Sequence, residues 1–488
     1  MIGIGIDFGT TNTTVAVVDG LSITYLELDL IAEPSTVMPT ALYIRRSMEH
    51  TVGRSAIASY LGDNVGRVIR LQKVDLGSIS MTVNATDGLS APGHSEGDAV
   101  EVSVRVRGDD DAELPGRLFR GLKSYLGVTV HERVKVFNRQ FRTVALITLI
   151  LTKIREIIEE NGWDLDRKIY VGRPINFVGG IASNKLAISR MKESCINAGF
   201  KSFVFYPEPI AASLNFLYSN SLDSNSVKQP IEQPSLKKLT GSVENLLTFD
   251  FGGGTLDLCL LTKKNNEFSV LGTQGVAIGG NKIDQLIMKE LVFPELGEGL
   301  RVKSAQHISE ADTVFPFYRY SDYVLNWQMS YMMNQPELME ILFRGIRSGP
   351  EQEAKLGRLW RLIRGNYCYA LLNATEQAKA RLSENEETSI CLSEIDLNID
   401  FSRDDLSRIL ISVVEEIEAL VFSLLKKTFL SLENIDRVVC TGGSSQLLPV
   451  QKKLEGLFPG KIEKFDYYRS IAGGLAIANA NGFTYELV

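Results

Sequence analysis

The sequence predicts an α/β protein with a duplicated core, in which two related lobes flank a cleft. The first observation is a repeated segment, because Ile6–Thr11 and Phe249–Thr255 each run from an apolar strand through aspartate and glycine to threonine. The second observation is the chain after each copy. Thr13–Val18 and Leu256–Leu261 are mainly β-branched or apolar, as the return strands of hairpins are. Two matched copies favour a duplicated core over one continuous sheet.

The composition is that of an ordinary globular protein with more than one domain. The 488 residues are 44% hydrophobic and 23% charged, which is enough for a large core. The net charge of -7, with scattered basic residues, argues against nucleic acid as a partner. No secretory signal precedes Ile2, and the aliphatic stretch Val144–Leu151 is too short for a membrane span. We therefore expect a cytoplasmic protein without membrane contact.

The five cysteines and four histidines lack ligand spacing, so we expect reduced thiols and no zinc-type site.

In the first lobe, apolar periodicity predicts two helices and two short strands. The helices are expected over 141–161 and 183–198, closed by Gly162 and Gly199, and the strands over 168–172 and 202–206. Pro207-Glu208-Pro209 is expected to end the last strand. The polar segment 219–245 is interpreted as a solvated connection between the lobes. Residues 75–111 mix Gly, Ser and Asp, which predicts an irregular surface subdomain with its own hairpin around the alternating run 100–106.

In the second lobe, residues 281–385 have a mostly helical pattern with Pro and Gly interruptions between 293 and 350. The aromatic clusters at 318–320 and 331–333 are interpreted as packing beneath a loop rather than as a partner surface. Ser402 and Asp405 predict a capped helix start, with apolar periodicity continuing to Leu424. A strand is expected over 437–441, followed by a third glycine turn, Thr441–Ser445, and a helix over 449–457.

The repeated turns have the chemistry of a phosphate site. Gly9 and the Gly252–Gly254 run lack Cβ atoms, so several backbone N–H donors can approach one anion, and the neighbouring threonines add hydroxyls. The aspartates Asp7 and Asp250 would repel a polyphosphate by about 3 kcal/mol per charge pair at about 5 Å and an effective dielectric near 20. A divalent cation between them removes this repulsion. The sequence therefore implies Mg²⁺, held through its water shell.

Three other structures could contain turns of this kind. One Asp-Phe-Gly-Thr alone is as well explained by an ordinary hairpin turn with a surface aspartate, and only the second copy makes that explanation weak. The chain has no Gly-x-x-x-x-Gly-Lys-Ser/Thr segment, which excludes a P-loop. Gly3-Ile4-Gly5 continues to Phe8 where a dinucleotide fingerprint requires glycine, which excludes a Rossmann site.

Three such glycine turns in this order resemble the actin, hexokinase and heat-shock protein 70 superfamily. The resemblance implies a two-lobed actin-like ATPase fold made of duplicated ribonuclease H-like domains. Gly172–Pro174, Tyr206–Ala212 and Glu376–Ser383 are similar to the nucleotide-binding domain of the heat-shock protein 70 branch, in its short bacterial form with inserts in the second lobe. Lobe I would then comprise 1–240, with a surface subdomain at about 40–112, completed by 461–488. Lobe II would comprise 241–460, with a mainly helical subdomain at about 281–385.

The resemblance also implies roles for individual residues. Asp7 and Asp250 would hold the hydrated Mg²⁺, and Lys123 matches the family's catalytic lysine. Glu208 and Asp257 match positions that orient the attacking water or ions, and Asp250 and Thr255 belong to the same catalytic group. The residues expected to contact ATP or ADP are Gly9, Thr10, Thr11, Gly252, Gly253, Gly254, Gly279, Gly280, Glu376, Lys379, Ser383, Gly442, Gly443 and Ser444.

The chain also departs from the family pattern. Gln446 stands where an arginine is common, Tyr468 where an acidic residue is usual, and Asn281 replaces the acidic residue after Gly279-Gly280. Nucleotide affinity is therefore less firmly implied than phosphate geometry. The sequence given ends at Val488 without a β-rich peptide-binding domain, so the substrate cycle of a full chaperone is not implied.

The leading functional hypothesis is an ATP-binding, slowly ATP-hydrolysing, chaperone-like protein whose lobes open and close with nucleotide and signal to a protein client or co-chaperone. The first alternative is a small-molecule kinase on the same fold, which needs an aspartate such as Asp257 as a base toward a substrate hydroxyl. The second is a nucleotide-switched scaffold or filament protein. The third is a nucleotide-insensitive pseudo-enzyme, which the residues Gln446 and Tyr468 favour.

Overall fold

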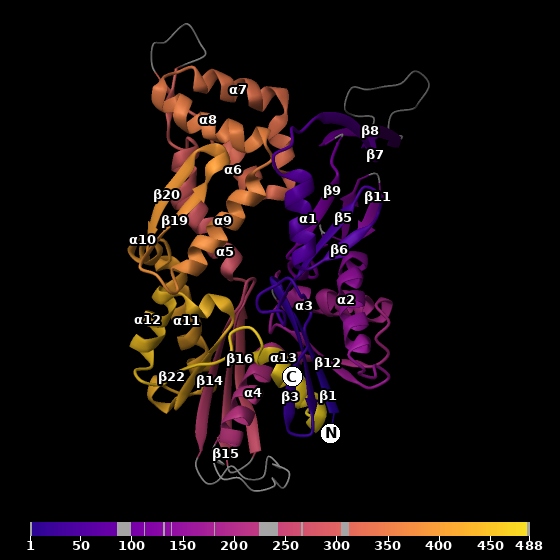
Figure 1. The fold of residues 1–488 in the computed structure, drawn as a ribbon, viewed down its shortest axis with the longest axis vertical. Helices are drawn as coiled ribbons and strands as arrows, with labels where there is room; N and C mark the ends of the chain where they lie inside the picture. The colour runs from indigo at the N-terminus through magenta and orange to yellow at the C-terminus, as the bar shows by residue number, and fades with distance from the viewer. Residues whose placement is uncertain are drawn as a thin grey trace.

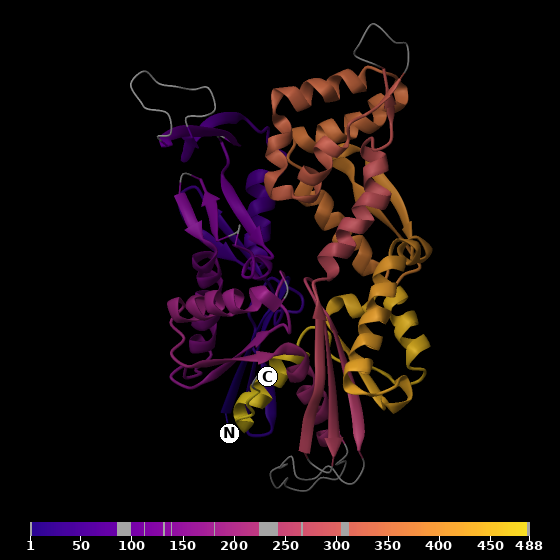
Figure 2. The same cartoon turned by 180° about the vertical axis from the view of Figure 1, so that it is seen from behind.

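The computed structural model describes residues 2–84, 99–111, 113–129, 132–137, 139–179, 181–223, 243–264, 267–303 and 312–485. The chain forms two halves that stand side by side along the long axis of the molecule (Figure 1). The first half is coloured indigo to magenta and the second mainly pink to yellow, except that the yellow helix α13 (Ser470–Asn481) lies against the sheet of the first half, and the reverse view shows the same arrangement (Figure 2). Each half has a mixed sheet at its base, so the α/β class is confirmed.

The sheet of the first half has the order β13-β12-β1-β2-β3, with β4 paired to β2. Strand β1 is antiparallel to β2, with Asp7 opposite Thr14, and parallel to β12. The alternation Ile2-Gly3-Ile4-Gly5-Ile6 explains how β1 packs on both faces, because Ile4 and Ile6 join the apolar core beneath α2 and α3. The glycines face α13, which lies so close that a Cβ on Gly5 would be 2.4 Å from the carbonyl oxygen of Ala472.

The sheet of the second half has the order β16-β15-β14-β21-β22 and repeats the same arrangement. Strand β14 is antiparallel to β15, with Asp250 opposite Asp257, and parallel to β21. In both halves, therefore, an aspartate-tipped strand forms a hairpin with the next strand and lies beside a later parallel strand. The two aspartates occupy the same place in their sheets.

The strands have the following bounds: β1 Ile2–Phe8, β2 Asn12–Asp19, β3 Ser22–Tyr25, β4 Met38–Pro39, β5 Ala41–Arg45, β6 His50–Val52, β7 Leu71–Asn84, β8 Ala99–Asp111, β9 Gly116–Arg120, β10 Arg133–Val136, β11 Arg139–Arg142, β12 Ile169–Arg173, β13 Phe203–Pro207, β14 Glu244–Phe251, β15 Leu256–Lys264, β16 Glu267–Val276, β17 Arg301–Val302, β18 Thr313–Val314, β19 Glu387–Leu392, β20 Leu397–Ser402, β21 Arg437–Thr441 and β22 Ile462–Lys464.

The α-helices are α1 Arg54–Asn64, α2 Thr143–Glu160, α3 Ile181–Asn197, α4 Glu208–Asp223, α5 Gly280–Ile287, α6 Tyr318–Leu325, α7 Pro336–Ile346, α8 Pro350–Arg364, α9 Cys368–Arg381, α10 Arg403–Ile409, α11 Ile411–Thr428, α12 Leu448–Leu457 and α13 Ser470–Asn481. Single turns of 3-10 or π-helix include η2 Leu122–Tyr125, η5 Met288–Val292, η7 Trp327–Asn334 and η10 Gly443–Gln446. None of the helices in the described part of the chain is long and apolar enough to cross a membrane.

Most predicted elements are present, including strand β21 with the predicted bounds and the capping box of Ser402 and Asp405. The helix predicted to continue from Ser402 is instead two helices, α10 and α11, separated at Leu410. The hairpin predicted within 75–111 is present as the paired strands β7 and β8, which are longer than the alternating run 100–106, and residues 85–98 lie outside the described residues. The predicted connection at 219–245 begins later, because α4 continues to Asp223, and residues 224–242 also lie outside the description.

All five cysteines are free in the structure. Cys195, Cys259, Cys368 and Cys440 are buried free thiols, and Cys391 is an exposed free thiol.

Candidate functional site

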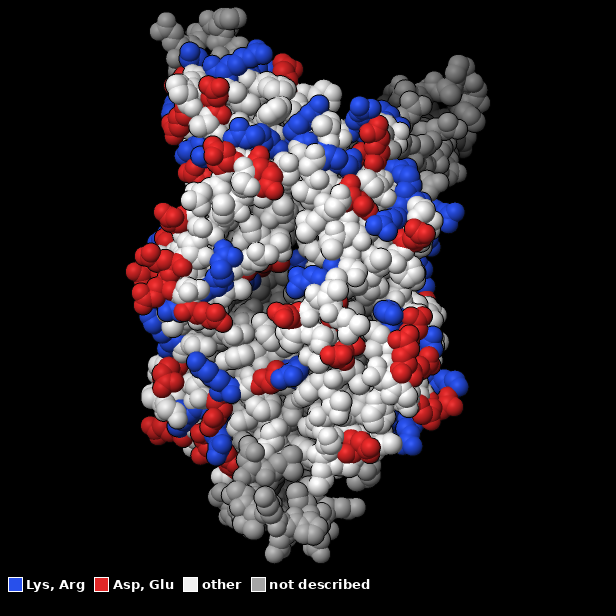
Figure 3. All heavy atoms as spheres, viewed as in Figure 1, with Lys and Arg blue, Asp and Glu red and all other residues white. Residues whose placement is uncertain are grey.

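The turns after β1 and β14 face one another across a pocket of about 550 Å³. The space-filling view shows the molecule hollowed near its centre, between the two halves (Figure 3). Of the site residues predicted from the sequence, only Asp257 and Gly279 do not line this pocket. Asp7 and Asp250, which come from different halves, share it.

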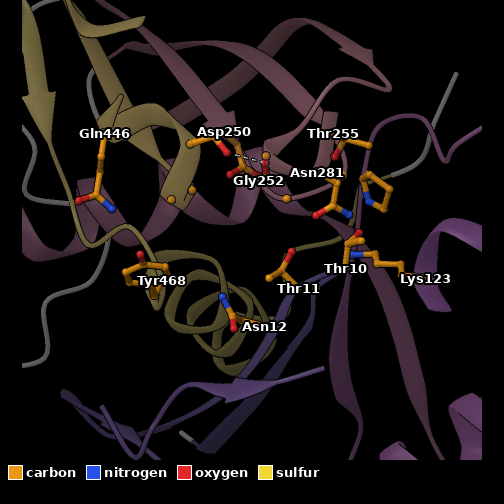
Figure 4. Close-up of a pocket in the computed structure, with 18 of the residues that line it drawn as sticks. Thr10, Thr11, Asn12, Lys123, Asp250, Gly252, Thr255, Asn281, Gln446 and Tyr468 are labelled. Carbon is orange, nitrogen blue, oxygen red and sulfur yellow. Dashed lines mark hydrogen bonds between the residues drawn. The ribbon is translucent and has the colours of Figure 1, made fainter. Parts of the chain in front are cut away.

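The two turns have the same backbone geometry. The N–H of Gly9 donates to the carbonyl oxygen of Asn12 at 3.0 Å, and the N–H of Gly252 donates to that of Thr255 at 3.0 Å. Glycine is required where the turns meet. A Cβ on Gly253 would lie 1.9 Å from Oγ1 of Thr11, closer than any non-bonded contact allows. Because Gly253 has no side chain, the turn after β14 can approach Thr11 in the turn after β1 (Figure 4).

Three carboxylates and one ammonium group are buried at one end of the pocket. Asp7 at the end of β1 and Asp250 at the end of β14 are 8% and 5% exposed. Glu208 begins α4, where Pro209 is tolerated because the first turn of a helix needs no backbone donor. The sequence had placed this residue in the connection after β13, so its helical position is a correction. Lys123 lies in η2 and is 6% exposed, with its Nζ 2.5 Å from Oε1 of Glu208.

Asp257 lies behind the pocket and is fully buried. Its Oδ2 accepts a hydrogen bond from Thr255 Oγ1 at 2.8 Å, and its Oδ1 accepts one from the N–H of Ile175 at 3.0 Å. Since Ile175 follows β12, this second bond joins the two halves beneath the pocket. The side chain of Asp257 therefore holds the turn after β14 rather than facing the pocket.

The buried carboxylates outnumber the positively charged groups near them. Burial, with the charge of Glu208, raises the pKa of Asp7 to about 7, although Lys123 opposes this shift. The same two causes raise the pKa of Asp257 to about 7, and burial with three neighbouring carboxylates raises the pKa of Asp250 well above its usual value. Burial lowers the pKa of Lys123, but Glu208 and Asp7 outweigh that effect, so the pKa is raised and the lysine stays charged.

These residues fit a hard divalent cation. Oxygen atoms of Glu208, Asp250 and Asp257 lie within 4.8 Å of one another. All the donors are carboxylate oxygens, which Mg²⁺ prefers, and the raised pKa values show that Lys123 alone does not balance their charge. Among the described residues, no comparable group includes the cysteines or histidines.

The other end of the pocket is built from α5, α9 and the turn after β21. Glu376, Lys379 and Ser383 line it from α9, at the one-turn spacing that puts them on one face. The Nζ of Lys379 lies 2.7 Å from Oδ1 of Asp284. Burial raises the pKa of Asp284 to about 6, against the effect of Lys379. Glu376 forms an ion pair with Arg120 of the first half at 3.1 Å.

Two residues that depart from the family pattern also lie at this end. Gln446 and Tyr468 project into the pocket opposite Lys123 and Thr10 (Figure 4). Tyr468 is 43% exposed, and its ring lies beside Gly443, where a Cβ would be 3.4 Å from the ring. The turn itself is fixed by Ser444, whose Oγ donates to the carbonyl oxygen of Gly252 at 3.0 Å.

Sequence reasoning missed several residues that line the pocket. Asp284 had a detectable signal, because it is an acidic residue on the helix that follows the glycine pair. The others carry no chemical pattern that distinguishes them from ordinary surface residues. They are Asn12, Ser124, Pro174, Phe177, Val178, Ala380, Glu384, Leu447 and Ile471.

Comparisons with known proteins agree with this geometry. A family model described as "Hsp70 protein" matches residues 366–479, which include α9, the turn after β21 and most of α13. Chaperone protein DnaK of Thermoplasma acidophilum is 27% identical over 160 residues, covering 32% of this chain and 22% of that protein. Chaperone protein DnaK of Elusimicrobium minutum is 24% identical over 248 residues, covering 49% of this chain and 31% of that protein. A chaperone protein HscA homolog of Acinetobacter baylyi is 24% identical over 218 residues, covering 44% of this chain and 25% of that protein. Each match spans less than a third of the relative's length.

Proposed function

The chain belongs to the heat-shock protein 70 family, and from this premise we propose that its central pocket binds ATP and hydrolyses it slowly to ADP and phosphate. The observation that carries the proposal is the pair of related aspartate-glycine-threonine turns that line one pocket from the two halves, beside Lys123. Such turns offer backbone N–H groups to an anion from two sides.

We also propose that the two halves are the lobes of an actin-like ATPase fold. Lobe I would comprise 1–240 completed by 461–488, and lobe II would comprise 241–460. The repeated strand arrangement supports this division, as does the position of α13 on the sheet of the first half. The surface subdomain at 40–112 and the mainly helical subdomain at 281–385 would then form the upper parts of the two lobes.

Asp7 and Asp250, together with Glu208, would hold Mg²⁺ at the carboxylate end of the pocket. When bound, the ion would supply positive charge that offsets the repulsion between these carboxylates and the phosphates. Asp257 would support this group from behind, through its hydrogen bonds to Thr255 and Ile175.

The chain's own residues would do the remaining work. The N–H groups of Gly252–Gly254 and the hydroxyls of Thr10 and Thr11 would hold the phosphates. Lys123 would donate hydrogen bonds to the γ-phosphoryl oxygens as negative charge develops on them. Glu208 holds the ammonium group of Lys123 in place and would accept a hydrogen bond from the attacking water. The α9 face with Glu376, Lys379 and Ser383 would contact the nucleoside.

A chaperone-like role would follow from lobe movement. Closure on ATP and opening after hydrolysis would change the surface offered to a protein client or co-chaperone. The kinase alternative is disfavoured by Asp257, since this candidate base is fully buried and both of its oxygens accept hydrogen bonds.

The proposal is tested by measuring phosphate release from ATP with Mg²⁺ and without any acceptor molecule. We expect slow, acceptor-independent release of phosphate that stops when EDTA is added. ADP formation that requires an added sugar or carboxylic acid would instead identify a kinase. If the protein binds ATP but releases no phosphate, it is a nucleotide-binding protein without ATPase activity.

A further inference from the structure

The two halves also meet above the pocket, through a segment to which the proposed chemistry assigns no role. This segment is η7, Trp327–Asn334, which lies within the Pro- and Gly-interrupted region of the second half. An apolar cluster of the first half, formed by α1, β5 and β9, is completed by two residues of the second half, Trp327 and Tyr369. The rest of the cluster consists of Ala41, Tyr43, Ala56, Ile57, Tyr60, Leu61, Val65 and Leu118.

Three aromatic rings form the centre of this contact. Trp327 of η7 lies 5.3 Å from Tyr60 of α1 and 4.7 Å from Tyr369 of α9, measured between ring centroids. Tyr60 and Tyr369 are themselves 5.2 Å apart and nearly perpendicular. These separations are in the range where aromatic pairs attract each other beyond the gain from burial. Trp327 therefore holds one ring from each half.

Hydrogen bonds surround the rings and also cross between the halves. The N–H of Gly66 donates to the carbonyl oxygen of Gly365 at 2.7 Å, and Nδ2 of Asn366 donates to that of Asn64 at 3.1 Å. Nε2 of Gln328 donates to the carbonyl oxygen of Leu118 at 3.4 Å. The contact thus has a buried apolar centre, and the surrounding hydrogen bonds fix how the two halves are positioned against each other.

The contact is connected directly to the nucleotide pocket on both sides. Tyr369 lies two turns before Glu376 on α9, the helix that lines the nucleoside end. On the other side, β9 continues from Leu118 through Arg120 to η2, which carries Lys123. Arg120 joins the two sides, since its Nη1 lies 3.3 Å from the hydroxyl of Tyr369 and 3.1 Å from Oε2 of Glu376. Separation of the rings would therefore move α9 away from Lys123.

We propose that η7 is an intramolecular clasp and that Trp327 is a positioning residue, which keeps α9 against β9 and thereby limits the rate at which nucleotide leaves the pocket. The inference rests on the proposed function for its effect on nucleotide, but the clasp itself is a property of the protein without nucleotide. It gives the interrupted region of the second half a role in regulating the same site.

The test compares Trp327→Ala with Trp360→Ala in the full chain. Trp360 on α8 is a matched control, because it is also a half-buried tryptophan but contacts Phe343 within the second half. A fluorescent ADP analogue is bound and then chased with excess ATP in a stopped-flow instrument. We expect at least a tenfold faster release from Trp327→Ala, the change produced by losing about 1.4 kcal/mol in the closed state only. Trp360→Ala and the conservative Trp327→Phe should stay within about twofold of the original rate.

A second measurement does not depend on nucleotide. Hydrogen exchange of the peptide that contains Gly66 reports the bond to Gly365. We expect faster exchange there in Trp327→Ala than in Trp360→Ala or the unmodified protein, without nucleotide present. If Trp327→Ala does not fold, Trp327→Leu replaces it, since leucine keeps apolar volume but removes both ring contacts.

The outcomes separate the two proposals. An unmodified protein that binds no nucleotide contradicts the proposed function, while the exchange measurement still decides whether the clasp exists. Equal release rates for Trp327→Ala and the unmodified protein would overturn the role of Trp327 in retaining nucleotide. Equal acceleration in Trp327→Ala and Trp360→Ala would also overturn it, because the effect would then be a general loosening of the second half. Unchanged exchange at Gly66 would overturn the clasp.

Discussion

Nζ of Lys123 lies 2.5 Å from Oε1 of Glu208, and both side chains are buried in the central pocket. The two residues come from η2 and from the start of α4, which are 85 residues apart in the chain. Burial makes this pair sensitive to any change that removes one partner, since an unpaired buried charge is costly. A substitution at Lys123 or Glu208 can therefore affect both the stability of the protein and the proposed hydrolysis of ATP.

Replacement of Lys123 should separate chemistry from binding. We expect Lys123→Ala to lower the rate of ATP hydrolysis roughly a hundredfold, because a buried donor to developing phosphoryl charge is lost. ATP affinity should change much less. Single-turnover phosphate release and calorimetric titration measure the two quantities. Lys153→Ala on the exposed face of α2 is the control, and hydrolysis that is equally fast in both variants would show that Lys123 has no catalytic role.

Neutralising Asp7 should stabilise the protein in the absence of metal. The folded-state pKa of Asp7 is raised from 3.8 to about 7, so the folded state binds more protons than the unfolded state between these values. Stability contributed by this group is therefore lost as the pH rises through 7. We expect the melting temperature of Asp7→Asn to exceed that of the unmodified protein by an amount that grows from pH 5 to pH 8. A difference that does not vary with pH would contradict the raised pKa.

The crossing of α4 and α13 should not tolerate a side chain at Gly474. A Cβ there would lie 1.7 Å from the carbonyl oxygen of Ala211, so one helix has to move. We expect Gly474→Ala to lower the free energy of unfolding by about 3 kcal/mol in a urea titration. Gly456→Ala in α12 is the matched control, because nothing lies within 4 Å of its Cβ, and it should be neutral or stabilising by up to about 1 kcal/mol. Similar costs for both changes would contradict the close crossing.

Tyr468 should contribute to nucleotide affinity through its ring. It lines the pocket beside Gly443 and remains 43% exposed, so a planar base can reach its face. We expect Tyr468→Ala to weaken ATP binding about tenfold, the lower end of what stacking of a base on an aromatic ring contributes. Tyr468→Phe keeps the ring and should bind normally. If both variants bind as the unmodified protein does, the nucleoside does not contact Tyr468.

Local patterns explain why much of the fold could be predicted from the sequence. Strand β21 and the hairpins after Asp7 and Asp250 have short-range signals, namely apolar runs that end at glycine turns. The hairpin formed by β7 and β8 was predicted from the alternating run 100–106, but the length of its strands was not, because Gly, Ser and Asp are depleted in strands and indicate a loop. Helix α4 was not predicted, because Pro207-Glu208-Pro209 was interpreted as the end of a strand, although proline is tolerated in the first turn of a helix.

The candidate site could also be predicted only where its residues are close together in the sequence. The glycine turns could be identified because each is contiguous in sequence. The pairing of Lys123 with Glu208 and the contact of Trp327 with Tyr60 depend on chain segments that meet only in the folded protein. No short-range pattern distinguishes Trp327 from Trp360, so its position between the halves required the structure.

The most direct test of the central claim is calorimetric titration of the protein with ATP and ADP, with and without Mg²⁺. Two aspartate-tipped turns that share one metal-assisted phosphate site predict saturable binding of both nucleotides that is strengthened by Mg²⁺, and loss of that strengthening in Asp250→Asn. Binding that is unaffected by Mg²⁺ and by this substitution, or no binding of either nucleotide, would contradict the account.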